Sequence, residues 1–272
     1  MTKLLNRQIA NQPVTIFTLM SELARKHNAI NLGQGFPDTE GPQDMVQLAA
    51  NALLDGRNQY APLTGLPELR AAVADASARF QNIPVDAESE VVVTSGATEA
   101  LAASFMALIE PGDEVVLIEP LYDTYLPVVR QLGGIPRLVR LEAPDWALPR
   151  EALKNAFGPR TKAIVLNTPM NPTGKVFNAE ELAFIADLMR QHDSYAICDE
   201  VYEHLVFGAP HLSLMHCRIC ASGASVLAVQ AKAFPLPAGK WVTLPPLPRW
   251  LRWWPKRTRT LYLPQPPTCN AP

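Results

Sequence analysis

A carboxylate and an aromatic hydroxyl stand three residues apart at the end of an apolar run in this sequence. The run is Ser194-Tyr-Ala-Ile-Cys-Asp-Glu-Val-Tyr202, in which Asp199 closes the apolar stretch. An aspartate there can hold a protonated ring nitrogen, and Tyr202 can contact a neighbouring ring hydroxyl. Surface solvation or a helix cap would also explain Asp199, but a carboxylate that closes a wholly apolar strand favours a functional site.

The segment Thr94-Ser-Gly-Ala-Thr98 lies between an apolar run and a helical pattern. Such a turn directs backbone N–H groups and the positive end of a helix toward an anion, which suits a phosphate. Ser95 and Thr98 can add hydroxyl donors. Ser or Thr caps most helices, so for the segment taken alone helix capping is the better explanation.

Asn167-Thr-Pro-Met-Asn-Pro-Thr-Gly174 follows another apolar run. Its Thr-Pro and Asn-Pro steps predict a rigid turn that could present Asn171 to the crevice beyond the strand ends, where α/β sheets bind ligands. On turn chemistry alone, a proline-rich connector with no binding role explains these residues equally well.

Strand and helix patterns alternate up to about residue 210, which predicts an α/β fold with a mainly parallel sheet. We expect strands over 90–94, 114–118, 162–166 and 195–198, and helices over 98–109 and 179–192. Each of the three motifs follows the carboxyl end of a predicted strand, which is the edge where such sheets bind ligands.

The charge distribution changes near Met215. Residues 1–215 hold 26 acidic and 16 basic side chains, whereas residues 216–272 hold eight basic side chains and no Asp or Glu. The later segment also has ten of the 26 prolines and four of the five tryptophans. Proline removes backbone donors and interrupts helices and central strands, so we expect residues 216–272 to be largely unstructured.

The bulk composition is that of a globular protein without a membrane segment. The start has no continuous apolar stretch of signal-peptide type, and no apolar run reaches the roughly 18 residues of a membrane span. A cytoplasmic location without membrane contact is therefore expected. Four cysteines in 272 residues do not suggest a disulfide framework.

Together the motifs resemble the class I/II aminotransferases of fold type I, in the branch that includes methionine and kynurenine/glutamine transaminases. The resemblance covers about residues 10–215. It is carried by Asn31-Leu-Gly-Gln-Gly-Phe-Pro-Asp38, Asn58-Gln-Tyr-Ala-Pro-Leu-Thr-Gly65, Thr94-Ser-Gly-Ala-Thr-Glu-Ala100, Glu119-Pro-Leu-Tyr-Asp123, Asn171-Pro-Thr-Gly174 and Cys198-Asp-Glu-Val-Tyr202.

This resemblance implies a pyridoxal 5'-phosphate (PLP) site and a role for each matching residue. The implied phosphate contacts are Ser95, Gly96, Ala97 and Thr98. The implied ring contacts are Tyr122, which would stack on the pyridine, Asn171 and Tyr202, which would bond its hydroxyl, and Asp199, which would pair with its nitrogen. Tyr60 would reach the phosphate of a neighbouring subunit, and Gly35 lies where the substrate carboxylate approaches.

The family also implies an architecture and a reaction. We expect an N-terminal arm and the start of a small domain over 1–45, an incomplete PLP-binding large domain over 46–215 with helices on both faces of its sheet, and an aberrant tail over 216–272. The implied reaction moves the amino group of an amino acid (methionine, glutamine or aromatic) to a 2-oxo acid in a homodimer. Other fold type I chemistry, such as a C–S lyase, and a non-catalytic PLP- or protein-binding remnant remain alternatives.

The Schiff-base lysine of the family is missing from its motif. The family pattern S-x-G-K-[ST]-F is expected some 30–40 residues after Asp199, where this chain has Ala-Val-Gln-Ala-Lys232-Ala-Phe and, later, Ala-Gly-Lys240-Trp. Lys232 has nearly the right spacing, yet an ordinary solvated lysine explains it better. We therefore expect no covalent anchor and no transaminase activity.

A frameshift near Met215 explains these departures together. Codons that encode residues 215–243 can be chosen so that the frame starting two bases later reads ALPDLRQRCVRIGSAGKSFSLTGWKVGY, which is the missing family segment. The hypothesis also explains Cys217-Arg-Ile-Cys220 and the basic, Trp-rich residues 249–259 as out-of-frame text. Accordingly, we expect no metal site, no nucleic-acid contact, and a sheet whose centre is left open where two family strands would lie.

Overall fold

The computed structural model describes residues 14–33, 42–56, 59–208, 210–216, 226–230 and 240–243. Its helices are α2 (Ile16–Lys26), α3 (Gln43–Leu54), α4 (Pro67–Ala76), the π-helix η1 (Ser77–Gln81), α5 (Gly96–Leu108), α6 (Tyr125–Gln131), α7 (Arg150–Ala156), α8 (Ala179–His192) and the short η2 (Leu214–His216). Its strands are β1 (Val91–Thr94), β2 (Glu114–Glu119), β3 (Ile135–Arg140), β4 (Thr161–Asn167), β5 (Tyr195–Glu200), β6 (Val226–Gln230) and β7 (Lys240–Thr243).

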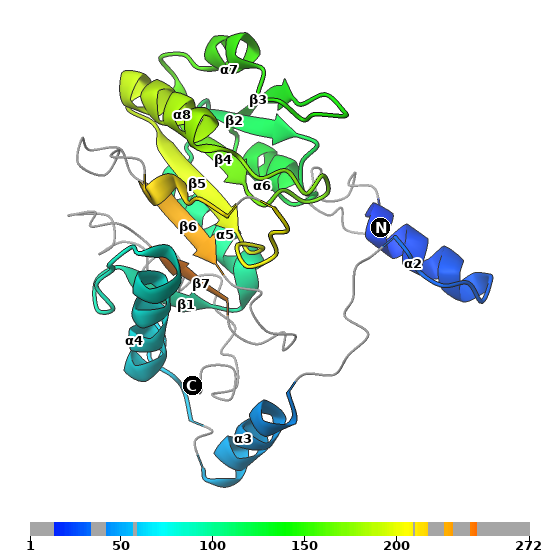
Figure 1. The fold of residues 1–272 in the computed structure, drawn as a ribbon, viewed down its shortest axis with the longest axis vertical. Helices are drawn as coiled ribbons and strands as arrows, with labels where there is room; N and C mark the ends of the chain where they lie inside the picture. The colour runs from blue at the N-terminus through cyan, green and yellow to red at the C-terminus, as the bar shows by residue number, and fades with distance from the viewer. Residues whose placement is uncertain are drawn as a thin grey trace, which may run out of the picture.

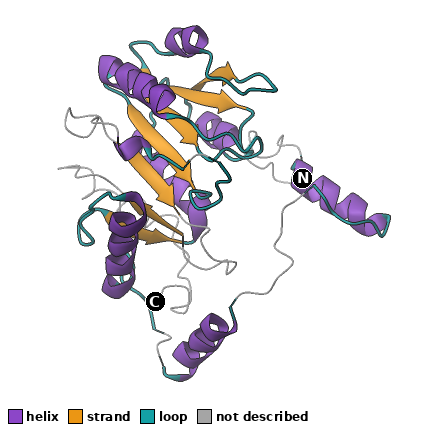
Figure 2. Ribbon diagram, in the orientation of Figure 1, coloured by secondary structure: helices purple, strands orange, loops and turns teal. Residues whose placement is uncertain are grey.

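One seven-stranded sheet, drawn in Figures 1 and 2, organises these elements in the order β1-β7-β6-β5-β4-β2-β3. Neighbouring strands from β6 to β3 pair in parallel, and β7 pairs antiparallel with both β6 and β1. The carboxyl ends of β1, β4 and β5 therefore lie along one edge of the sheet, as the sequence predicted.

Two apolar cores, one on each face of the sheet, confirm the expected helices on both sides. Alternate residues of β2 enter different cores, because side chains of a strand point to opposite faces: Val116 packs with α7 and α8, whereas Leu117 packs with α5 and α6. Leu153 and Phe105 are fully buried examples from the two helical layers. Burial on both faces explains why the parallel strands are continuous apolar runs.

The predicted elements that flank the motifs are confirmed with small changes of boundary. The helix expected over 179–192 is α8, and a capping box fixes its start: Asn178 accepts from the backbone N–H of Glu181, whose side chain accepts from the backbone N–H of Asn178. The strand expected over 195–198 is β5, which continues to Glu200, so Asp199 lies within the strand.

The expectation of an open sheet centre is wrong. β6 and β7 fill the gap between β5 and β1, with Ala196 opposite Val226 and Val92 opposite Val242. Both segments come from the stretch expected to lack regular structure. The prolines on which that expectation rested lie in 244–255, outside the described residues. Residues 221–234 contain no proline, and Val-Leu-Ala-Val and Trp-Val-Thr are runs of good strand formers. The remaining residues of 217–272 lie outside the described part of the chain.

The helices α2 and α3 stand away from the sheet in Figure 1. Neither has a buried residue, and apolar side chains such as Ile16, Leu48 and Leu54 are exposed. The predicted division at residue 45 falls within α3, so a separate arm over 1–45 remains a prediction. Among the described helices, none combines the length and the apolar character needed to cross a bilayer.

Candidate functional site

Two of the motifs meet at the ends of β4 and β5. These strands pair in parallel, and their register places Asn167 directly opposite Asp199. The third motif begins at Thr94, at the end of β1, where the backbone of β7 places Lys240 opposite Thr94. The edge of the sheet thus carries the loop after β4, the buried end of β5 and the turn after β1.

The carboxylate of Asp199 is buried, with 5% of the residue exposed, and it has a phenol as partner. Tyr125, the first residue of α6, donates its hydroxyl to Asp199 Oδ2 at 2.6 Å. Burial raises the pKa of Tyr125 well above its ordinary value, and the negative charge of Asp199 raises it further. The phenol therefore stays protonated and donates to a charged acceptor.

Two more tyrosines gather around this pair. The ring of Tyr122 meets that of Tyr125 edge-to-face, with 5.8 Å between centroids. Tyr122 and Tyr202 both lie close enough to act electrostatically on Tyr125, and both are partly buried against the α5–α6 core. Three residues predicted from sequence, Tyr122, Asp199 and Tyr202, are thus brought together around Tyr125, which sequence reasoning missed. The sequence carries no separate signal for Tyr125, because its contact with Asp199 depends on how α6 packs beside β5.

Asn167 connects the Asn171 loop to Asp199. Its side-chain Oδ1 accepts from the backbone N–H of Asn171 at 2.7 Å, and its Nδ2 donates to the backbone oxygen of Asp199 at 2.9 Å. The backbone N–H of Thr168 donates to that same oxygen at 3.1 Å. Asn171 is partly buried beside this bridge. The positioning role of Asn167 was not predicted, because it depends on the β4–β5 register.

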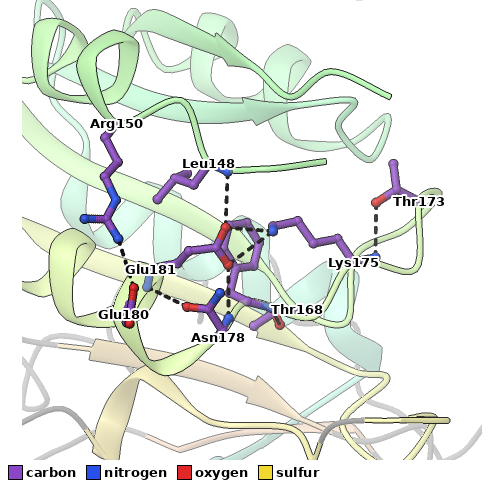
Figure 3. Close-up of polar contacts among 9 residues, drawn as sticks. Leu148, Arg150, Thr168, Thr173, Lys175, Asn178, Glu180 and Glu181 are labelled. Atoms are coloured by element: carbon purple, nitrogen blue, oxygen red, sulfur yellow. Dashed lines mark hydrogen bonds and ion pairs between the residues drawn. The ribbon is translucent and has the colours of Figure 1, made fainter. Parts of the chain in front are cut away.

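A buried ion pair supports the far side of the same loop (Figure 3). Lys175 Nζ lies 2.8 Å from Glu181 Oε1 and 3.1 Å from Oε2. The carboxylate of Glu181 also accepts the backbone N–H groups of Leu148 and Asn178 at 3.1 and 3.0 Å. Lys175 is close in sequence to Asn171, but its amine is bound to Glu181. The pair therefore supports the loop.

The turn after β1 holds an anionic oxygen. The backbone N–H of Ser95 donates to a carboxylate oxygen of Glu99, and no side chain caps α5. The Glu99 carboxylate oxygen occupies a position where an oxygen of another anion could accept the hydrogen bond from the Ser95 N–H. Gly96 has a φ of 85°, which glycine adopts without strain. Ser95 and Thr98 are exposed, whereas Ala97 is buried.

The other predicted residues lie apart from this group. Tyr60 is 81% exposed. Its segment is attached to β1, because Val93 N–H donates to Thr64 O and a Cβ on Gly65 would come within 2.5 Å of the Val93 side chain. Gly35 and Lys232 lie outside the described residues.

The described donors and acceptors fit the cofactor that the motifs imply. A buried carboxylate suits a cationic ring nitrogen, and a turn that already binds a carboxylate oxygen suits a phosphate. The described residues match the lysine anchor of the cofactor less well than they match its ring and phosphate. Lys175 pairs with Glu181, and Lys162 packs over Tyr195 at the opposite end of β5. Neither of these described lysine side chains supplies the missing amine.

Comparison with known proteins agrees with this geometry. Residues 27–239 match the family described as aminotransferase class I and II. The chain is 50% identical over 204 residues to a probable N-succinyldiaminopimelate aminotransferase of Mycobacterium tuberculosis, covering 74% of this chain and 51% of that protein. It is 42% identical over 193 residues to the methionine aminotransferase of Escherichia coli, covering 71% of this chain and 50% of the relative.

The three-dimensional structure also resembles solved structures of aminotransferases. The solved structure of N-succinyldiaminopimelate aminotransferase from Mycobacterium tuberculosis superimposes with a TM-score of 0.89 at 40% identity, over 98% of this chain and 70% of that chain. The expected fold type I architecture is thereby confirmed, and PLP is the cofactor of these enzymes. The chain spans about half the length of the curated relatives it matches.

Proposed function

Because this chain belongs to the class I and II aminotransferase family, we propose that it carries the PLP site of an enzyme that transfers an amino group from an amino acid to a 2-oxo acid. The observation that carries the proposal is the buried Asp199 carboxylate, held by Tyr125 and flanked by Tyr122 and Tyr202. The donors that we propose are methionine, glutamine and aromatic amino acids, of which methionine is named in the Escherichia coli relative.

We assign the residues of this chain the following work. When bound, PLP supplies an electron sink for the carbanion that forms when an amino acid loses its α-proton. Asp199 keeps the ring nitrogen protonated, and Asn171 and Tyr202 donate to the ring hydroxyl. Tyr122 packs against the ring face, and the turn Ser95, Gly96, Ala97 and Thr98 binds the phosphate. Substrate contact near Gly35 and a dimer in which Tyr60 reaches the neighbouring phosphate belong to the same proposal.

For this particular chain we propose noncovalent PLP binding without transaminase activity. In the family a lysine is both anchor and general base, moving the proton at the substrate carbon. Here Lys175 is committed to Glu181, and Lys232 does not stand in the family motif. A frameshift near Met215 accounts for that loss, and sequencing the coding DNA through this codon tests it. A shifted frame that encodes no GSAGK-type segment contradicts the frameshift.

Titration with PLP followed by borohydride reduction tests the site and the missing anchor together. We expect saturable PLP binding that Asp199→Ala weakens, and no PLP mass retained after reduction and denaturation. Asp193→Ala, at an exposed αL position after α8, is the matched control that leaves binding unchanged. Absence of binding contradicts the site, whereas PLP fixed to Lys232 or Lys240 contradicts the missing anchor.

The reaction class is tested on the protein made from a gene with the restored frame. Methionine, glutamine and aromatic donors should each yield a 2-oxo acid at the expense of an added 2-oxo acid acceptor. Release of a thiol from sulfur-containing substrates, without amino-group transfer, would instead identify a C–S lyase.

A further inference from the structure

We propose that Tyr125 is a positioning residue that sets the charge and orientation of Asp199 toward the ring nitrogen of the cofactor. The inference rests on the proposed function, because it assigns a role within the PLP site. It goes further by naming a second residue, buried beneath the contacts to the cofactor, that would control how firmly the ring proton is held.

The geometry commits one oxygen of Asp199 to Tyr125. The phenol donates to Oδ2 at 2.6 Å, which is the short distance of a hydroxyl bonded to a charged carboxylate. The backbone N–H of Val201 lies 3.4 Å from the other oxygen, Oδ1. A carboxylate has about four lone-pair positions, so the phenol orients the group without exhausting its capacity to accept.

Solvent water has little access to the hydrogen bond between Tyr125 and Asp199. Tyr125 and Asp199 are 3% and 5% exposed. A buried carboxylate loses its hydration, which disfavours the charged form unless a donor replaces it. Tyr125 is such a donor, and its hydrogen bond stabilises the Asp199 carboxylate inside the protein.

Packing fixes the phenol in place. The Tyr125 ring meets Phe105 of α5 and Tyr122 edge-to-face, with centroids 6.5 and 5.8 Å away. The residue opens α6, and its backbone N–H donates to Tyr122 O at 3.3 Å. The hydroxyl is therefore aimed at Asp199 before any ligand arrives.

The phenol remains a donor at every working pH. Burial raises the pKa of Tyr125 well above its ordinary value, and the facing groups Asp199, Tyr122 and Tyr202 raise it further. A carboxylate stabilised as an anion is a weaker base, so the shared proton stays on the ring nitrogen. Without the phenol, Asp199 would draw that proton toward itself, and the ring would become a poorer electron sink.

The test compares two ligands on three proteins. PLP and its 1-deaza analogue, which has carbon in place of the ring nitrogen, are titrated into the parent chain, Tyr125→Phe and Tyr195→Phe. Tyr195 begins β5, at the other end of the strand from Asp199. Tyr195→Phe therefore removes a tyrosine hydroxyl away from the site and serves as the matched control. We expect Tyr125→Phe to weaken PLP binding about tenfold and to move the pH midpoint of the bound-ring absorption downward by about one unit.

The analogue separates a chemical role from a packing role. It has no nitrogen for Asp199 to hold, so Tyr125→Phe and the parent should bind it equally. An equal loss for both ligands overturns the inference, since it shows only a structural effect. Unchanged PLP binding by Tyr125→Phe overturns the inference and leaves the proposed function standing. Failure of the parent to bind PLP overturns both.

A second pair of variants applies if Tyr125→Phe does not fold. In Asp199→Asn the acceptor is uncharged, so removal of the phenol should be tolerated. Addition of Tyr125→Phe to Asp199→Asn should change PLP affinity by less than about twofold, because the coupling between the two residues is gone. A tenfold further loss in the double variant contradicts the proposal.

Discussion

Asn167 uses both ends of its amide to join two parts of the candidate site. Its oxygen holds the backbone of Asn171, and its nitrogen holds the backbone oxygen of Asp199. Both contacts are made by a buried residue, so solvent cannot replace them. The loop that carries Asn171 and the strand that carries Asp199 are thus fixed to each other through Asn167.

Asn167→Ala should therefore affect stability and PLP binding together. We expect the free energy of unfolding to fall by about 1–3 kcal/mol, because a buried donor and acceptor lose their partner. PLP affinity should fall about tenfold as the loop loses its fixed position. Asn155→Ala, at an exposed position of α7, is the control and should alter neither quantity. Chemical denaturation and PLP titration measure both, and a variant with parental PLP affinity would contradict the positioning role.

Glu203 gives the molecule a specific pH dependence. Burial raises the pKa of Glu203 from its ordinary 4.5 to about 8, and the nearby charge of Glu200 adds to the shift. The facing polar groups are the Gln81 amide, which donates to Glu203, and His204, whose Nε2 lies 3.7 Å from Oε1. The folded protein thus binds a proton that the unfolded chain releases above pH 4.5.

The sign of the effect follows from that difference. The stabilising contribution is complete below pH 4.5 and is lost as the pH rises toward 8. The slope is at most about 1.4 kcal/mol of unfolding free energy per pH unit. Glu203→Gln should flatten the decline between pH 5 and 8, as measured by denaturation at several pH values. An unchanged slope in the variant would show that another group causes it.

At the scale of elements, α8 and the loop before it form one unit. Glu181 caps α8, pairs with Lys175 and accepts from Leu148, so a single carboxylate ties three segments together. The neighbouring Glu180 makes only a surface pair, 3.6 Å from Arg150, with 87% of its side chain exposed. Figure 3 shows the two glutamates side by side at the start of the helix.

This contrast predicts different costs for the same substitution. Glu181→Ala should lower the free energy of unfolding by about 3–5 kcal/mol, since it leaves the buried Lys175 amine without its partner. Glu180→Ala should cost less than about 1 kcal/mol. Thermal or denaturant unfolding compares the two variants directly. Similar costs for both would contradict the assignment of Glu181 as the support of the Asn171 loop.

The helices and strands also show how much of the structure can be predicted from sequence patterns. Apolar runs and the alternation of strand and helix patterns predicted β1, β2, β4, β5, α5 and α8 closely. The motif residues Asp199, Tyr122 and Tyr202 could be selected because the family resemblance identifies them. Tyr125 and Asn167 could not, since their roles depend on strand register and on packing between α6 and β5. The strand β6 was missed because the proline-rich character of 244–255 was extended to a proline-free segment.

At the scale of the whole molecule, the sheet depends on two short strands from beyond Met215. β6 and β7 lie between β5 and β1, so they connect the part of the sheet that carries Asp199 to the part that carries the Ser95 turn. The proposed ring-binding and phosphate-binding parts of the site thus share one sheet only through these strands.

Ending the chain at His216 should therefore disrupt the fold. Without β6 and β7, β5 and β1 would face each other across an open sheet centre with unpaired backbone groups. We expect loss of a cooperative melting transition and a rise in aggregation, measured by calorimetry and light scattering. A shortened chain that melts like the parent would contradict the order of strands described above.

A crystal structure of the chain soaked with PLP would locate the cofactor relative to Asp199. We predict that the ring lies across the ends of β4 and β5, with its nitrogen within hydrogen-bond distance of Asp199, its phosphate at residues 95–98, and no bond to any lysine. A ring bound elsewhere, or an Asp199 side chain turned into bulk solvent, would contradict it.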